Sequence, residues 1–98
     1  MKLKKGVNIQ SLNIKTRPAL IAAEQIWNKY KQELVVTCGL DSEHSAGSFH
    51  YYGLALDFRT NYFQALERTK AFERLGRLLG NSFNVILHST HIHVEYDP

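Results

Sequence analysis

The chain has 98 residues, a length typical of one domain with a single modest hydrophobic core. Hydrophobic residues make up 44% and charged residues 21%, which excludes a disordered or low-complexity chain. The formal net charge is +3, and the basic residues form no long block, so we expect no nucleic-acid partner. The single cysteine, Cys38, cannot form an internal disulfide and lies in an apolar run typical of a buried structural thiol.

The N-terminal residues Met1 to Gly6 are basic, but no apolar segment typical of a signal peptide follows them. No stretch is long and apolar enough to predict a membrane-spanning helix. We therefore expect a protein made in the cytoplasm without a signal peptide and without membrane insertion. Residues 1–98 are expected to form one domain that acts as a monomer.

The first third of the chain predicts an extended arm and one helix. Residues 1–15 are mixed, and we assign no regular element to them. A helix is expected from about Pro18 to Gln32, with Thr16 as N-cap and Pro18 in the first turn, where its missing N–H costs nothing. Apolar residues recur three or four apart and form one stripe: Leu20, Ala23, Trp27, Tyr30 and Leu34.

The middle of the chain predicts a strand, a loop and a second strand. The β-branched run Leu34 to Cys38 is typical of a buried strand, and the small polar residues 41–48 indicate a loop. Gly53 to Arg59 alternates, so that Leu54, Leu56 and Phe58 point one way while Ala55, Asp57 and Arg59 point the other.

A second helix and two strands complete the chain. The helix is expected from about Phe63 to Leu79 and ends at Gly80-Asn81. Strands are expected at Phe83 to Leu87 and Thr90 to Tyr96, joined by a tight turn or a bulge. Because strands and helices do not alternate regularly, we predict an α+β domain with a small, mainly antiparallel sheet covered on one face by two helices.

The last strand places polar residues on one face. His91, His93 and Glu95 share it, and Asp57 lies on the polar face of its own strand. If the two strands are neighbours, Asp57 and His93 come close together, and His50 can fold over them from the preceding loop. These histidines and the aspartate are ligand types that zinc favours. We therefore expect one catalytic zinc ion, with three protein ligands and an open position at which water is activated to attack an amide.

Two motifs in these segments resemble those of a known family. One is Ser48-X-His50-X-X-Gly53-X-Ala55-X-Asp57, and the other is His91-X-His93. Together they are similar to the motifs of the D-alanyl-D-alanine metallopeptidases, which belong to a larger group with the lysostaphin-type enzymes and the hedgehog N-terminal domain. The order of predicted elements between Gly6 and Glu95 fits as well. The closest members would be small phage-encoded or phage-like versions that consist of a bare catalytic domain, as in an endolysin.

The resemblance implies a role for each residue of the site. Zinc would be held by His50, Asp57 and His93. His91 would stand beside the ion without binding it, as general base or as stabiliser of the transition state. Glu95 either orients a histidine or lies on the surface. The implied fold is hedgehog-like, and the implied substrate is the peptide stem of bacterial peptidoglycan, cleaved by an endopeptidase or a D,D-carboxypeptidase.

Two positions depart from the family pattern. Many members carry an arginine after the strand equivalent to residues 35–38, where it holds a substrate carboxylate, but none is present here. Arg59 is the candidate replacement, and Tyr52 is a second candidate for substrate binding. Many members also have an acidic base three residues before the last ligand, where this chain has Thr90. The role of base then falls on His91, or on Glu43 or Glu95.

Other functions compete with a peptidase. A non-catalytic zinc domain that only binds the cell wall or a protein would use the same ligands. A phosphoesterase with two histidine motifs would need a second such tripeptide on a partner strand, and the sequence has none. For His88 we expect a polar or hydrogen-bonding position at the rim of the site.

Overall fold

The fold was described from a computed structural model, which describes residues 1–10, 12–38 and 53–98. Within those ranges the helices are α1 (Arg17–Lys29) and α2 (Ala65–Leu79), and a short 3₁₀ turn covers Gly80–Ser82. The described strands are β1 (Lys2–Leu3), β2 (Val35–Cys38), β3 (Ala55–Arg59), β4 (Phe83–Leu87) and β5 (His91–Tyr96). The predicted α+β class is therefore confirmed. Neither helix in the described part of the chain combines the length and apolar character needed to cross a membrane.

The described strands form one sheet in the order β1-β2-β3-β5-β4. All neighbouring pairs are antiparallel except β1 and β2, which run parallel. The sequence analysis assigned no strand to residues 1–15, and this was wrong for Lys2–Leu3. The backbone N–H of Lys2 donates to Leu34 O at 2.7 Å, and that of Lys4 donates to Val36 O at 2.9 Å. Two residues are too few to show a period of two, so this strand leaves no signal in the sequence.

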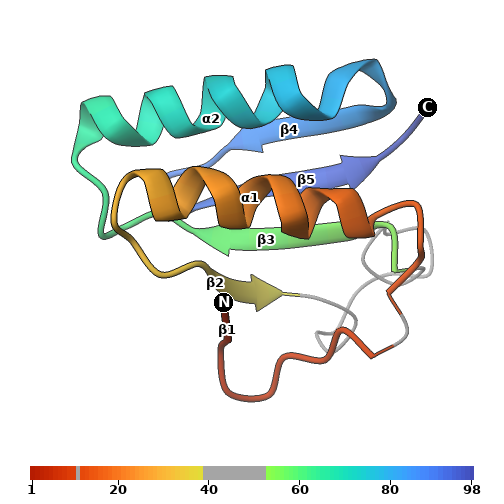
Figure 1. The fold of residues 1–98 in the computed structure, drawn as a ribbon. Coiled ribbons are helices and arrows are strands. Elements are labelled where there is room, and N and C mark those ends of the chain that lie inside the picture. The colour runs from red at the N-terminus through yellow and green to blue at the C-terminus, as the bar shows by residue number, and fades with distance from the viewer. Residues whose placement is uncertain (11, 39–52) are drawn as a thin grey trace.

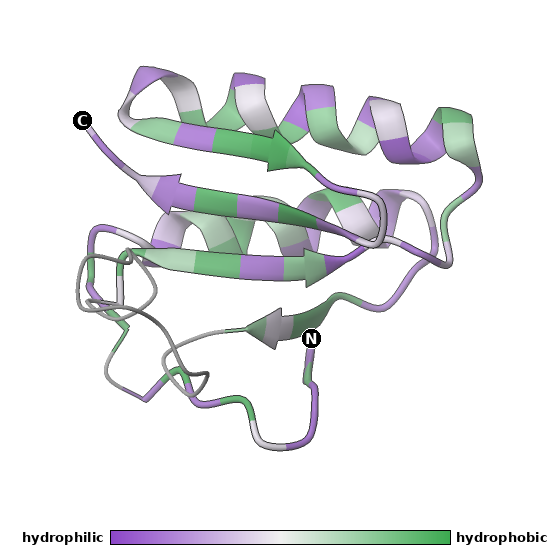
Figure 2. Ribbon diagram, turned by 180° about the vertical axis from the view of Figure 1, so that it is seen from behind, coloured by the Kyte–Doolittle hydropathy of each residue, from purple (hydrophilic) through white to green (hydrophobic). Residues whose placement is uncertain are grey.

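Both helices lie on the same face of the sheet (Figure 1). Figure 2 views the sheet from the opposite side, where hydrophilic and hydrophobic residues alternate along β3, β4 and β5. Leu56 and Phe58 of β3, and Ile92 and Val94 of β5, have no exposed surface and build the core beneath the helices. The residues between them therefore point to the face that carries no helix.

Thr16 connects the start of α1 to the start of β3. It precedes the helix, as predicted, but its side chain does not cap it. The hydroxyl is buried and donates to Gly53 O at 2.9 Å, and the N–H of Asn13 donates to the same oxygen at 3.0 Å. Gly53 has a φ of 71°, a conformation that favours glycine. The turn that leads into β3 is thus fixed by the segment before α1.

Trp27 anchors α1 against the far end of β3. It is fully buried, and its Nε1–H donates to Arg59 O at 3.3 Å and to the Tyr62 hydroxyl at 3.1 Å. Its ring meets Phe58 and Phe63 edge to face, with centroids 5.9 and 5.3 Å apart. The expected role of Trp27 in the core is confirmed, and its hydrogen bonds fix the backbone where Arg59 leaves the sheet.

The contribution of the Tyr62 hydroxyl to the stability of this core can be tested. It accepts from Trp27 and donates to Glu33 O, and burial raises the pKa of Tyr62 above its ordinary value of 10.0. Tyr62→Phe is expected to lower the free energy of unfolding by about 0.5–1.5 kcal/mol at neutral pH, because both hydrogen bonds are lost.

The pH dependence of that difference has a defined sign. The neutral phenol is favoured in the folded state, so its stabilisation is complete below pH 10.0 and is lost as the pH rises through the raised pKa. Urea unfolding of both proteins should show the difference shrinking above pH 10.0. A difference that stays constant with pH would contradict the assignment.

Candidate metal centre

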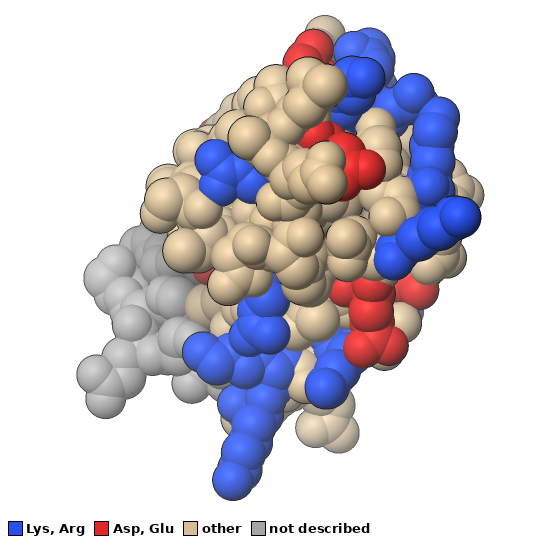
Figure 3. All heavy atoms as spheres, turned by 90° about the vertical axis from the view of Figure 1, so that its left-hand side faces the viewer, with Lys and Arg blue, Asp and Glu red and all other residues tan. Residues whose placement is uncertain are grey.

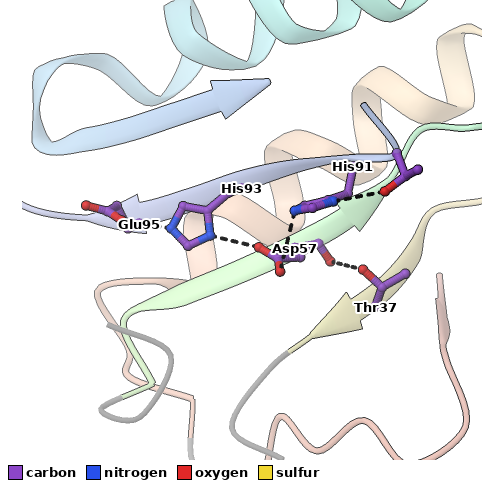
Figure 4. A network of polar contacts seen from close by, with 6 residues as sticks. Thr37, Asp57, His91, His93 and Glu95 are labelled. Atoms are coloured by element: carbon purple, nitrogen blue, oxygen red, sulfur yellow. Dashed lines mark hydrogen bonds and ion pairs between the residues drawn. The ribbon is translucent and has the colours of Figure 1, made fainter. Parts of the chain in front are cut away.

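The register between β3 and β5 brings the predicted site residues together. The two strands are antiparallel neighbours, with Asp57 opposite His93, Arg59 opposite His91, and Ala55 opposite Glu95. Because alternate residues face the core, these side chains share the face without helices (Figure 4). The expectation that Asp57 and His93 lie close together is confirmed.

His93 lies between two carboxylates. Its Nδ1 is 2.8 Å from Asp57 Oδ1, and its Nε2 is 2.8 Å from Glu95 Oε1. The side chains of His93, Asp57 and Glu95 are 15%, 16% and 19% exposed. A neutral imidazole has one N–H and can donate to one of these oxygens. The second contact needs either a second proton on the ring or a cation that both the nitrogen and the carboxylate bind.

This arrangement fits a zinc ligand set in its chemistry. A histidine that binds zinc commonly donates its other ring N–H to a carboxylate, which fixes the ring and its tautomer. With Nε2–H donating to Glu95, the lone pair of Nδ1 would face the carboxylate of Asp57 at 2.8 Å, so both groups could be donors to one cation beside them. In such a set His93 Nδ1 and Asp57 would be the donor groups, and Glu95 would be the group that orients the ring.

Glu95 is itself held in place from β4. Asn84 lies opposite it in the sheet, and Asn84 Nδ2 donates to Glu95 Oε2 at 3.1 Å and to Asp97 Oδ2 at 3.3 Å. One oxygen of Glu95 thus contacts His93 while the other is fixed by Asn84. Of the two readings left open by the sequence, this geometry favours a residue that orients a histidine.

His91 lies beside the pair without forming a close contact to it. Its Nε2 is 3.9 Å from Asp57 Oδ2, beyond hydrogen-bonding distance, and its side chain is 31% exposed. Its Nδ1 lies 3.2 Å from the Thr90 hydroxyl (Figure 4). The hydroxyl of Thr90 therefore contacts the imidazole that the sequence analysis expected to act as the base.

His88 lies beside His91 in the same cluster, consistent with the polar or hydrogen-bonding position expected for it, but its stacking on His91 was not predicted. Its ring stacks on that of His91 with centroids 4.7 Å apart and planes 25° apart. Its N–H donates to His91 O at 2.9 Å and closes the turn between β4 and β5. The tight-turn alternative is thus confirmed. A two-residue turn of Ser89 and Thr90 predicts that His88 pairs with His91. The sequence did not make this prediction unique, because a bulge at the same place would change the pairing.

The remaining predicted residues divide into two groups. Arg59 is half-buried on β3, next to Asp57 and opposite His91. His50, Tyr52 and Glu43 lie outside the described residues, so the third ligand and one substrate contact stay predictions. Within residues 1–10, 12–38 and 53–98, no three His, Cys, Asp or Glu side chains are grouped so as to hold a metal ion. The described part of the chain thus supplies two of the three expected ligands.

Comparison with known proteins adds no relative. No protein-family model matches the chain, and searches of curated proteins and of solved structures found no match. The resemblance to the D-alanyl-D-alanine metallopeptidases therefore depends on the two motifs. The hedgehog-like form of the fold stays a proposal beyond the α+β class.

The contact between Thr90 and His91 can be tested by substitution. Thr90→Val removes the hydroxyl with little change in shape, and Thr90→Ser keeps it. We expect the Nδ1 resonance of His91 in long-range ¹H–¹⁵N spectra to shift in the valine variant and to stay close to wild type in the serine variant. Since Thr90 is exposed, unfolding free energies should change by less than about 1 kcal/mol. Identical His91 spectra in wild type and Thr90→Val would exclude this hydrogen bond.

Proposed function

We propose that the chain is a zinc-dependent peptidase that hydrolyses amide bonds in the peptide stems of bacterial peptidoglycan. The observation that carries the proposal is the position of His93 between Asp57 and Glu95, 2.8 Å from each, with His91 alongside. In a neutral imidazole the remaining lone pair faces a carboxylate in place of a hydrogen-bond donor, which is the arrangement expected of a metal ligand.

One zinc ion would be held by His50, Asp57 and His93. When bound, the ion supplies a positive charge that polarises a carbonyl group and activates water near neutral pH. Glu95 accepts the second ring N–H of His93 and so keeps Nδ1 available as a donor. Asn84 restrains Glu95 through its other oxygen, which limits the freedom of the whole set.

His91 is the proposed general base. A neutral imidazole accepts a proton near neutral pH, and Nε2 is the nitrogen directed toward Asp57. It would take a proton from the attacking water and deliver it to the leaving amine. Thr90 at Nδ1 and the stacked ring of His88 restrain the imidazole so that Nε2 stays directed toward the reacting atoms.

The setting of this activity follows from the same proposal. The fold would be the hedgehog-like arrangement shared by this group of zinc enzymes, built as a single catalytic domain. The site of action would be the bacterial cell wall, in a small phage lysis enzyme of endolysin type. Both endopeptidase and carboxypeptidase activity are compatible with the described residues.

The ligand assignment predicts the metal content of variants. Asp57→Ala and His93→Ala are expected to lose zinc and to be less stable, because metal binding and folding are linked. Glu95→Gln should still bind zinc, about 10- to 100-fold more weakly. Glu73→Ala on α2 serves as control and should match wild type. Zinc would be measured by mass spectrometry after dialysis, and one equivalent of zinc in both ligand variants would refute the assignment.

The assignment of His91 predicts a separation of metal binding from turnover. His91→Ala is expected to keep one equivalent of zinc and to lose about 10²- to 10⁴-fold in kcat, the usual contribution of a general base. Turnover would be followed by mass spectrometry of the muropeptides released from purified peptidoglycan, which also identifies the bond. Wild-type turnover in His91→Ala would move the base elsewhere.

The same digestion separates the peptidase from its main competitor. Cleavage that stops with a chelator and returns with zinc supports the proposal. Zinc bound at one equivalent without cleavage of any stem peptide would instead favour a non-catalytic zinc domain.

A further inference from the structure

A cleft lies between the two helices, on the face of the sheet opposite to the candidate metal centre. Its volume is ≈ 320 Å³. That volume corresponds to about ten water molecules, since each occupies about 30 Å³ in the liquid. Both helices line it, through Gln25, Ile26, Lys29, Arg74, Arg77 and Leu78. Because the helices cover one face and the Asp57–His93 pair lies on the other, a ligand in this cleft would leave the metal centre accessible (Figure 1).

In the described part of the chain, the lining of this cleft carries three positive charges and no negative one. Lys29 comes from α1, and Arg74 and Arg77 come from α2. Among the residues that the structure describes, none of these three forms an ion pair with a carboxylate. Their charges repel one another, and an anion bound between them would relieve that repulsion.

The positive charge continues along α2. A second hollow adjoins the cleft and shares Arg74 and Arg77 with it, and Lys70 and Glu73 also line it. Lys70, Arg74 and Arg77 recur four and three positions apart, which places them along one side of the helix. Figure 3 shows Lys and Arg side chains gathered at its upper right, the helix-covered side at the level of α2 in Figure 1. The cations thus form a row, which fits a ligand with repeated negative charges.

The remaining lining residues favour one class of polyanion. A guanidinium binds phosphate oxygens in a bidentate manner, and an ammonium binds them as a point charge. Ile26 and Leu78 offer apolar contact to a short carbon chain between phosphates, and Gln25 offers an amide to a hydroxyl. No aromatic ring is found among the described lining residues, whereas sites for single-stranded nucleic acid use aromatic rings to stack the bases. The chemistry therefore suits a polyol-phosphate chain better than a nucleic acid.

We propose that this cleft and the row of cations along α2 bind consecutive phosphates of a linear polyol-phosphate polymer attached to the bacterial cell wall. Phosphate binding follows from the charges, whereas the location of the polymer in the wall rests on the proposed function. The bound polymer would hold the enzyme at its insoluble substrate and raise the local concentration of stem peptides at the metal centre. The helix-covered face would thus retain the enzyme while the opposite face cleaves.

The binding test uses a synthetic glycerol-phosphate oligomer, with phosphate-free polyglycerol of equal length as the neutral probe. The full chain should bind the oligomer, and not polyglycerol, in isothermal titration calorimetry. The triple variant Lys29→Gln, Arg74→Gln and Arg77→Gln should bind about 3- to 100-fold more weakly, because three exposed charge contacts are lost. The slope of log Kd against log salt concentration should fall by about one for each cation removed.

A matched control removes the same charge elsewhere. Lys2→Gln, Lys5→Gln and Lys15→Gln together delete three exposed lysines that do not line the cleft. This control should keep wild-type affinity. Glutamine is about as good a helix former as lysine or arginine, so circular dichroism spectra and unfolding midpoints of the cleft variant should also match wild type.

The activity test compares cell walls with and without their phosphodiester-linked polymers. The zinc-loaded wild type should release muropeptides more slowly from walls stripped of these polymers. The cleft variant should cleave both preparations at the rate that wild type shows on stripped walls. Both proteins should cleave a soluble stem peptide equally, because the cleft residues lie away from the metal centre.

The outcomes separate this inference from the peptidase proposal. Equal affinity of wild type and the cleft variant for the oligomer, or equal affinity of wild type for the phosphate-free probe, overturns the inference and leaves the peptidase standing. Tighter binding of a single-stranded DNA of equal charge than of the oligomer overturns the assignment to a polyol phosphate. Binding that depends on the cleft, without cleavage of any stem peptide, overturns the peptidase and leaves the phosphate site standing.

Discussion

The register between β3 and β5 is the constraint on which the rest of the molecule depends. Asp57 pairs with His93, and the residues on either side, Phe58 and Ile92 among them, are fully buried. A shift of one residue would turn the polar side chains into the core and expose the apolar ones. Burial of a large apolar side chain contributes about 1.5–3 kcal/mol, so several such residues hold the register firmly. The core on one face thus fixes the geometry of the site on the other.

The polar face concentrates groups that are fully paired only when His93 carries a second proton or when a cation is bound. Two carboxylates flank one imidazole, and two further imidazoles, His88 and His91, stack nearby. A neutral imidazole leaves one of these contacts without a proton, so the cluster departs from full local pairing in that state. Departures from local consistency are concentrated at functional sites, and here the departure coincides with the candidate ligands. This coincidence favours metal binding over a structural role for Asp57 and His93.

Much of this arrangement could be predicted from alternation alone. The strand Phe83–Leu87 has the predicted bounds, and the pattern of β5 separates Ile92 and Val94 from the histidines. Contacts that depend on tertiary packing could not be predicted. The bond from Thr16 to Gly53 crosses 37 positions of the sequence, and β1 is too short for any period. The stacking of His88 on His91 could not be predicted, because it depends on the type of turn between β4 and β5. The residues Ser89 and Thr90 do not determine that turn type.

The order of strands also gives the polar face a direction. Lys4 and Arg59 lie on the side of Asp57 toward β1 and β2, whereas Glu95 and Asp97 lie together near Asn84 of β4. The line from one group to the other passes the Asp57–His93 pair. A peptide lying along it would experience attraction for its carboxylate at one end and for its amino or cationic groups at the other. Because this asymmetry is fixed by the sheet, an extended ligand with opposite charges at its two ends would be favoured in one orientation on this face.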